Sequence, residues 1–467
     1  MPAMTWAAQW SGTSSLTLSE TYTSNVNIGS AGDEQDEFIT QINPAITLSG
    51  RGRGLQLDFS YNMQNLLYAR NDDRNATFHQ LRAHALATLV ENALFVDMAS
   101  SVNQQAISLR ERAPTDNLTI SSNRTDTIAS HISPYLRHAF GDVATTELRY
   151  GYDKVYYDAT GADSESNSYS ATISSGVTFK TFPWSLGYSR QQIHASGQQA
   201  QTPSARFEMY SANLNYVASR KLTFTTAGGY ENNDYETSAA RQKPGGAFWN
   251  AGLIWGPTSR TSLQASYGKR FFGNNYAFGA NHMTRRSTWR LSYAENVTAV
   301  NLLQPESRVF MIADASTGNI FVDPQTGLPI LATVIIPTLT SDVYVSKHWQ
   351  ASLGYQLKRN NFSLLLFNER RFFERTDELQ RFNGGNALWG LQLAPHSRAS
   401  LNTGWQHIEY SLDGQVDDFW HAGMTLSHDI QDRVKGAIEL YHSTRNSSKP
   451  ANEFSDNRVV ARLTMTF

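Results

Sequence analysis

Side chains able to do chemistry are plentiful in this 467-residue chain, but they form no recognised catalytic or metal-binding pattern. The twelve histidines are scattered, and neither an HExxH motif nor another metal-ligand spacing occurs among them. No GxSxG motif marks a nucleophilic serine, and fingerprints for dinucleotides and phosphates are absent. The chain has no cysteine, which excludes disulfides, thiolate metal sites and c-type haem attachment. We therefore expect a protein that is not an enzyme and holds no cofactor.

A weaker kind of chemistry remains, in which charged side chains on one face bind a passing polar solute repeatedly. Strand parity assigns the following charged and histidine residues to one polar face: Asp58, Arg82, Asp97, Glu147, Arg149, Asp153, Arg290, Glu369, Arg371, Lys435, Glu439, Arg458 and Arg462, with His84 and His421. They predict a mixed-charge conduit that hydrogen-bonds a sugar polymer. The alternative, favoured for any single residue, is that they form ion pairs that stiffen or partly fill a barrel. Because the signs are mixed, no strong ion selectivity follows.

The elements that position these residues have a period of two. In the segment LQLDFSYNMQ (55–64), apolar and polar residues alternate without exception. Such alternation gives a β-strand one apolar and one polar face. The pattern recurs at 169–179, 210–216, 249–255, 289–293, 399–406 and 458–467.

The two faces favour a membrane barrel over a soluble all-β protein such as a propeller. The polar face carries Ser, Thr, Asn and Gly, whereas a solvated face usually carries Lys and Glu, and the apolar face often ends in Tyr or Trp. Most Tyr and Trp fall on the lipid face, and Phe95 and Phe367 are the aromatic candidates for the lumen. No apolar run reaches the 18 residues of a membrane helix. The net charge of −2 gives no reason to expect a nucleic-acid partner.

Connector lengths predict the topology. Short turns alternate with long polar loops, as expected of periplasmic turns and extracellular loops, so both chain ends should be periplasmic. We predict an antiparallel up-and-down transmembrane β-barrel of about 22 strands (range 18–24). Residues 1–14 would form an N-terminal periplasmic segment and 15–467 the barrel. Both 284–297 and 342–357 are interpreted as descending strands, so an ascending strand is expected near 308–313, and the rest of 300–340 should be a long loop or a lumen constriction.

Prolines interrupt two of the predicted strands. Pro44 in ITQINPAITLSG (39–50) and Pro134 in IASHISPYLRHAFG (128–141) each lie in mid-strand. Because proline lacks the N–H that a strand ladder needs, we expect a bulge at each position.

Several segments resemble known proteins. The last strand, RVVARLTMTF, ends in Phe467 and resembles the terminal signature of outer-membrane barrels, which implies recognition by the barrel assembly machinery. The segments HISPYLRHAFGDVATTELRYGYDKVYY (131–157), YGKRFFG (267–273) and RRSTWRLSYAENVT (285–298) resemble outer-membrane proteins associated with PEP-CTERM/exosortase systems and exopolysaccharide operons. The resemblance implies a barrel that helps exopolysaccharide cross the outer membrane, with periplasmic export proteins as partners. It implies no particular binding residues.

These observations predict a porin-like channel in the bacterial outer membrane. Its outer face would contact lipid, and exopolysaccharide would pass through its lumen. A plugged siderophore receptor is disfavoured, because strands begin by about Ser15 and leave little N-terminal room for a plug. Two alternatives remain: a structural barrel that sheathes a partner such as a cytochrome, or anchors surface polymer, and an outer-membrane enzyme that trims polysaccharide or lipid.

Overall fold

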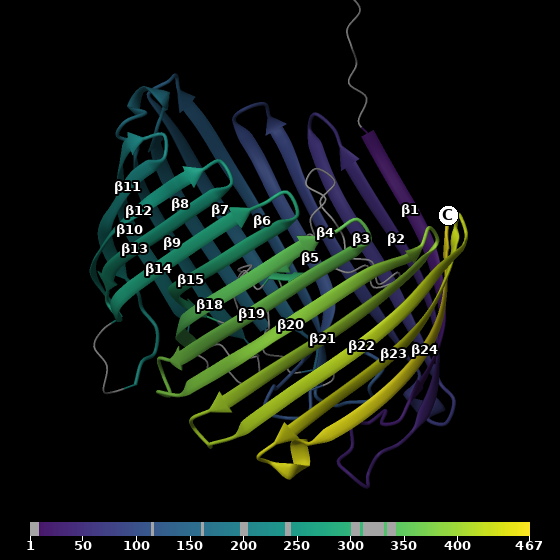
Figure 1. Ribbon diagram of the computed structural model, residues 1–467. Helices are drawn as coiled ribbons and strands as arrows, with labels where there is room; N and C mark the ends of the chain where they lie inside the picture. The colour runs from purple at the N-terminus through teal and green to yellow at the C-terminus, as the bar shows by residue number, and fades with distance from the viewer. Residues whose placement is uncertain are drawn as a thin grey trace, which may run out of the picture.

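The computed structural model describes residues 9–113, 116–159, 163–196, 204–238, 244–299, 309–311, 331–333 and 342–467. It is built almost entirely of β-strands (Figure 1). The strands are β1 (Gln9–Thr23), β2 (Glu37–Arg51), β3 (Leu55–Tyr68), β4 (Ala76–Val90), β5 (Leu94–Ala106), β6 (Arg124–Phe140), β7 (Ala144–Tyr157), β8 (Asp163–Ser175), β9 (Trp184–Ser196), β10 (Ala205–Ser219), β11 (Leu222–Asn232), β12 (Gly245–Thr258), β13 (Thr261–Arg270), β14 (Gly273–Met283), β15 (Ser287–Ala299), β16 (Val309–Met311), β17 (Leu331–Thr333), β18 (Val343–Gln356), β19 (Asn360–Phe373), β20 (Leu379–Ala394), β21 (Ser397–Tyr410), β22 (Val416–Gln431), β23 (Val434–Ser447) and β24 (Phe454–Thr466). Three single-turn 3₁₀ helices lie in connections: η1 (Asp72–Arg74), η2 (Val177–Phe179) and η3 (Pro450–Asn452). Among the described residues, no helix is long and apolar enough to span a membrane.

One closed antiparallel sheet of 22 strands forms the body of the protein. Each strand pairs with its neighbours along the chain, and β1 pairs with β24 to close the barrel, from Ser15 opposite Thr466 to Thr23 opposite Arg458. Figure 1 shows the first and last strands lying side by side. The predicted up-and-down barrel and its strand number are confirmed. The first strand begins at Gln9, inside the segment 1–14 expected to precede the barrel, and β24 joins it from Ser15 onward.

The strand expected in 300–340 is not part of the barrel. Strand β15 pairs directly with β18, and within the described residues β16 pairs with β17 in a separate two-stranded sheet. The prediction was wrong because β13 and β14 are joined by two residues, Phe271 and Phe272, on the side where other connections are long. Gly273 follows them with a φ of +115°, which favours glycine. Strand β15 therefore ascends, and no hidden strand is needed.

The two mid-strand prolines cause gaps in the ladder rather than bulges, so the expected bulges are wrong. Pairing of β2 with β3 stops after Ile42 and resumes at Ala45 in the same register. Pairing of β6 with β7 is interrupted in the same way around Pro134, between Ile132 and Tyr135. In β2 the Asn43 side chain accepts a hydrogen bond from the Asn65 backbone N–H (3.3 Å), which compensates for part of the gap without an inserted residue.

Register also fixes the two faces of the wall, since residues directly opposite each other on neighbouring strands share a face. Tyr188, Tyr210 and Tyr230 lie opposite one another on β9, β10 and β11. Tyr210 is 48% exposed and Tyr230 is 53% exposed, and large apolar side chains on the same face of other strands are exposed as well. A continuous surface of exposed aromatic and aliphatic side chains is what contact with hydrocarbon requires. The opposite face of the sheet is polar and turns inward.

Candidate functional site: the lumen and its inner loop

The interior of the barrel is identified by a single connection that reaches several separate strands. Residues 107–113 and 116–123, between β5 and β6, are named the inner loop. This loop forms hydrogen bonds with the side chains of Tyr68 at the end of β3, Arg445 on β23 and Arg458 on β24. A loop can meet side chains from strands on both sides of the β1–β24 junction only if those side chains point into the lumen.

Strand register places the predicted lumen-facing residues on this inner face. They are Asp58, Arg82 and His84 on β3 and β4, Asp97 on β5, Glu147, Arg149 and Asp153 on β7, Arg290 on β15, Glu369 and Arg371 on β19, His421 on β22, Lys435 and Glu439 on β23, and Arg458 and Arg462 on β24. Each alternates with outward side chains along its strand, as the two-residue period requires.

Burial divides the lumen into two halves. Along the inner face of β3, Asp58 is exposed, Gln64 is half-buried, and Leu66 and Tyr68 are buried. On β24 the long polar side chains follow the same trend, since Arg458 is buried toward the long-loop end and Arg462 is half-buried below it, while the small Thr464 is buried against Thr17. The inner face is therefore open at the short-turn end and covered at the long-loop end.

Ion pairs join most of the predicted charges to close neighbours on the wall. These pairs are Arg51–Asp58 (2.7 Å), His84–Asp97 (2.9 Å), Arg137–Glu147 (2.8 Å), Arg149–Glu147 (3.1 Å), His131–Asp153 (2.6 Å), Arg371–Glu369 (3.1 Å) and Arg462–Glu439 (3.4 Å). Lys435 lies directly opposite Asp429. His421 packs beside the rings of Phe419 and Tyr441. In the described part of the chain, Arg82 and Arg290 have no ion-pair partner, and both are exposed to the lumen.

The first part of the inner loop is held by a buried arginine of the wall, Arg445 on β23. Arg445 donates to Asp417 Oδ2 (2.8 Å) and to the backbone carbonyl of Leu109 (2.9 Å), and it also donates to the carbonyl of Glu111. The side chains of Arg445 and Asp417 are 6% and 2% exposed. Because a buried charge needs a counter-charge and hydrogen bonds, this pair both neutralises itself and holds the loop backbone. Leu109 packs beside Phe382, Ile408 and Tyr410 on the wall.

Arg110 makes a second set of contacts with the same part of the wall. Its guanidinium pairs with Glu378 and with Asp413 (3.1 Å), and lies 4.4 Å from the centre of the Tyr410 ring. The Gln415 side chain donates to the Arg110 carbonyl (2.8 Å). Asp413 also accepts from Lys449 Nζ (2.5 Å), and this hydrogen bond lowers the pKa of the Asp413 carboxyl below its usual value. A lowered pKa keeps Asp413 ionised as the counter-ion of Arg110.

The later part of the inner loop is held by β24 and by an apolar cluster. Arg458 pairs with Asp116 of the loop and Asp456 of its own strand, and donates to Thr119 Oγ1 (3.0 Å). The side chains of Arg458 and Asp456 are 3% and 0% exposed. The loop thus runs from β20–β23 to the region of β24 and the first strands, and crosses this part of the lumen.

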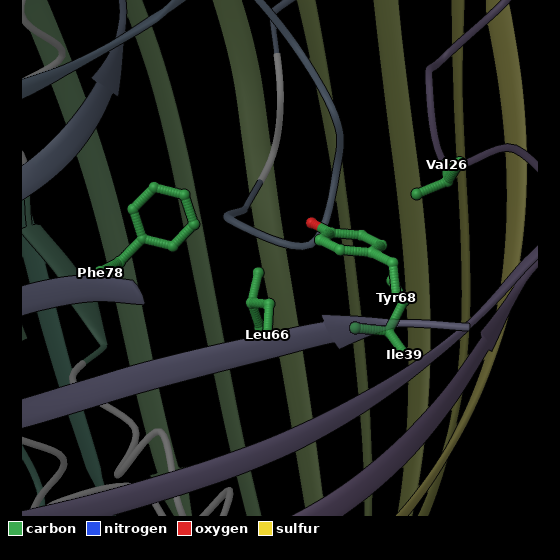
Figure 2. Packing of buried hydrophobic residues seen from close by; sticks show 5 residues of the cluster. All are labelled: Val26, Ile39, Leu66, Tyr68 and Phe78. Atoms are coloured by element: carbon green, nitrogen blue, oxygen red, sulfur yellow. The ribbon is translucent and has the colours of Figure 1, made fainter. Parts of the chain in front are cut away.

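The apolar cluster lies at the ends of β2 and β3. Figure 2 shows its five side chains, Val26, Ile39, Leu66, Tyr68 and Phe78, gathered beside the wall. Leu118 and Ile120 of the inner loop pack against this cluster. The Tyr68 hydroxyl donates to the Leu118 carbonyl (3.0 Å), and the Ile120 N–H donates to the Val26 carbonyl (2.8 Å).

The sequence pattern did not identify the inner loop as the segment that enters the lumen. Residues 110–126 look like an ordinary polar surface loop, and 300–340 was the segment expected to constrict the lumen. Apart from β16 and β17, that segment lies outside the described residues. One feature of the sequence could have identified the inner loop, namely the apolar residues Leu109, Leu118 and Ile120 inside an otherwise polar connection. These side chains pack against apolar residues at the long-loop ends of the strands.

The remaining candidates lie on the wall or at its rim. Phe95 stacks on Tyr135 (ring centroids 4.9 Å apart) on the inner face, and Phe367 packs beside the cluster that receives Leu109. Phe467 lies at the short-turn rim, where its N–H donates to the Ser14 carbonyl (2.8 Å) and its side chain is exposed. Within the described ranges, no group of three or more His, Cys, Asp or Glu side chains is arranged to hold a metal ion.

Solved structures with the same architecture are outer-membrane receptors. The chain is similar to the siderophore receptor PirA from Acinetobacter baumannii, with a TM-score of 0.54, 8% identity, and coverage of 98% of this chain and 80% of that one. The protein is a bacterial outer-membrane β-barrel. It is also similar to the FrpB iron transporter from Neisseria meningitidis (TM-score 0.53, 10% identity, 97% of this chain and 82% of that one). A mutant of the ferric enterobactin receptor PfeA from Pseudomonas aeruginosa gives a TM-score of 0.53 at 10% identity, covering 98% of this chain and 80% of that one. No protein-family model and no curated protein matches the chain. At these identities the likeness shows the fold alone.

Proposed function

We propose that this barrel is a passive outer-membrane channel and that its cargo is exopolysaccharide leaving the cell. The observation that carries the proposal is the polar inner face, open at the short-turn end and narrowed by the inner loop at the long-loop end. The ion pairs along this face keep it hydrated without giving it a single dominant sign. A neutral or mixed polymer would therefore meet many weak hydrogen-bonding groups and no strong barrier.

The dimensions of the wall are compatible with a polymer. With 22 strands spaced about 4.8 Å apart and tilted by about 40°, the backbone cylinder has a diameter of about 40 Å. Side chains and the inner loop reduce this width at the long-loop end. The inner loop and its contacts with the wall therefore narrow the lumen at this end.

The choice of exopolysaccharide rests on the resemblance of 131–157, 267–273 and 285–298 to proteins of PEP-CTERM and exopolysaccharide systems. In this proposal periplasmic export proteins deliver the polymer, the barrel assembly machinery inserts the chain, and Phe467 belongs to the insertion signal. The barrel itself performs no bond-breaking step. Energy for movement comes from synthesis and delivery on the periplasmic side.

Two measurements test the two levels of the proposal. Purified protein in planar lipid bilayers should give steady conductance that added polysaccharide fragments reduce in a concentration-dependent way. Deletion of the gene should lower secreted polysaccharide, and the wild-type chain should restore it. A barrel that inserts without conducting would contradict the channel. Normal polysaccharide output after deletion would contradict the cargo and leave the channel standing.

The fold similarity favours a second candidate, uptake of a metal chelate, since the compared barrels are named as siderophore and iron transporters. This candidate predicts saturable binding of a ferric chelate to the purified barrel and slower growth of a deletion strain under iron limitation. The exopolysaccharide proposal predicts neither result.

A further inference from the structure

A row of charged side chains crosses the outer, lipid-facing surface near the long-loop end of the barrel. Lys347 on β18 lies opposite Arg370 on β19, which lies opposite Arg381 on β20. The row ends in a carboxylate on each side, with Glu295 opposite Lys347 and Glu409 opposite Arg381. Three cations on adjacent strands therefore stand together, and we name Lys347, Arg370 and Arg381 the cationic row.

The central cation of the row differs from its two neighbours, because no described residue forms an ion pair with it. Lys347 pairs with Glu295 (3.2 Å) and Arg381 pairs with Glu409 (2.9 Å). Arg370 is exposed and has no ion-pair partner among the described residues. Like charges directly opposite on neighbouring strands destabilise a sheet, and here the arrangement occurs twice in succession. An anion outside the protein would relieve this repulsion.

The height of the row points to the region of lipid headgroups. On the same face of β19, Leu366 is 41% exposed and lies four residues below Arg370, which is about 13 Å along the strand. On β18, Trp349 lies two residues below Lys347 on the same face. Aromatic side chains on the lipid face mark the level where hydrocarbon gives way to headgroups. The cationic row begins just beyond that level, on the side of the long, extracellular loops.

We propose that the cationic row binds the phosphate groups of lipopolysaccharide in the outer leaflet. Lipopolysaccharide is the abundant anionic lipid of this leaflet, and its phosphates lie at the boundary between acyl chains and sugars. Arginine suits this partner because its planar guanidinium donates two parallel hydrogen bonds to a phosphate. Arg370 is the primary ligand, while Lys347 and Arg381 flank it at one strand spacing on either side.

The test compares lipopolysaccharide retained by the purified barrel and by an Arg370→Ala variant after identical detergent washing. Loss of one bidentate arginine–phosphate contact should weaken retention by about ten- to a hundred-fold. Arg370→Lys should restore part of it, because the charge remains but the fork geometry is lost. Lipopolysaccharide stripped of its phosphates should bind the wild-type barrel at least as weakly as intact lipid binds Arg370→Ala, because it also loses the contacts of Lys347 and Arg381.

A matched control is Lys154→Gln on β7, which removes another exposed, outward cation. Lys154 is already paired with Glu165 (2.8 Å), so its loss should leave retention unchanged. The characteristic gel mobility of unheated barrels verifies that each variant is folded. Equal retention by wild type and Arg370→Ala, or an equal loss in Lys154→Gln, would overturn the proposal. Equally tight, Arg370-dependent binding of phosphatidylglycerol vesicles would overturn the assignment to lipopolysaccharide.

Discussion

The contact between Arg445 and the inner loop allows the role of that loop to be measured. The perturbation is the double substitution Asp417→Leu with Arg445→Met. Replacing both partners avoids leaving Asp417 as an uncompensated buried charge, which the single change Arg445→Ala would do at a cost of about 3–5 kcal/mol. Replacement of a buried ion pair by apolar groups of similar size is often neutral for the fold. The double variant should therefore keep the barrel and lose the hydrogen bonds to the loop.

The magnitude follows from the two bonds that Arg445 donates to loop carbonyls, those of Leu109 and Glu111. Hydrogen bonds from a charged donor contribute about 1.5 kcal/mol each at the lower end of their range, so about 3 kcal/mol of loop attachment is lost. Since 1.4 kcal/mol is a factor of ten, the fraction of barrels with a detached loop should rise about a hundred-fold. Both side chains are almost fully buried, so solvent screening reduces this value little.

The assay is single-channel conductance in planar bilayers. The wild-type barrel should show rare steps to a larger conductance, and the double variant should show them about a hundred times more often. A disulfide supplies the opposite perturbation. The chain has no cysteine, so Val26→Cys with Ile120→Cys introduces one pair, at positions joined by a backbone hydrogen bond and packed in the same cluster. Oxidation should suppress steps that arise from the later part of the loop, and reduction should restore them.

The matched control is Arg51→Met with Asp58→Leu, which removes a lumen ion pair at the open end, away from the inner loop. This control should leave the frequency of steps unchanged. If the double variant at Asp417 and Arg445 folds and its conductance is indistinguishable from that of the wild type, the inner loop does not limit the lumen. If the control produces the same steps, they report wall charge rather than loop attachment.

Three further predictions concern individual side chains of the loop contacts and of the lumen wall. Asp413 has a lowered pKa, so the stabilisation from its ion pair with Arg110 is fully present above the ordinary aspartate pKa of about 4 and is lost as the pH falls through the lowered pKa. Conductance steps should therefore become frequent only below about pH 4. The variant Asp413→Asn should show them at neutral pH. Arg82→Glu with Arg290→Glu replaces two lumen cations that lack ion-pair partners in the described chain, so the reversal potential in a salt gradient should shift toward cation selectivity, and an unchanged potential would show that ions do not pass near them. Tyr68→Phe removes the hydroxyl that donates to the Leu118 carbonyl, and should weaken attachment of the later part of the loop by about 1 kcal/mol, seen as roughly five-fold faster labelling of a cysteine placed at Leu118.

The barrel was predictable because its determinant is local. A two-residue period in segments such as 55–64 dictates which side chains meet lipid, and the same parity placed Asp58, Glu369 and Arg462 on the inner face. The count of strands was also predicted, although by a partly wrong route. The hairpin of β13 and β14 has its short turn on the long-loop side, and nothing in loop length alone distinguishes such a hairpin from a continuous strand.

The inner loop was not predictable from the same pattern, because its contacts are distant in sequence. Arg445 meets Leu109, and Arg458 meets Asp116, across most of the length of the chain. Periodicity assigns a side chain to a face and gives no information on which loop will cover it. The prolines show the complementary case: Pro44 removes a ladder donor as predicted, but the Asn43 side chain compensates, so the register continues without a bulge.

Because β1 pairs with β24, the barrel can close only after its last strand has joined the sheet. Until β24 has joined the sheet, β1 has only one partner, and the forming sheet presents two unpaired edges able to join other chains. Asp116 and Thr119 of the inner loop must also lie inside the barrel before Arg458 can form its ion pair and hydrogen bond with them. A chain truncated before β24 would consequently lose both the closing strand and the contact of Arg458 with the inner loop. It would remain an open, aggregation-prone sheet rather than a slightly smaller pore.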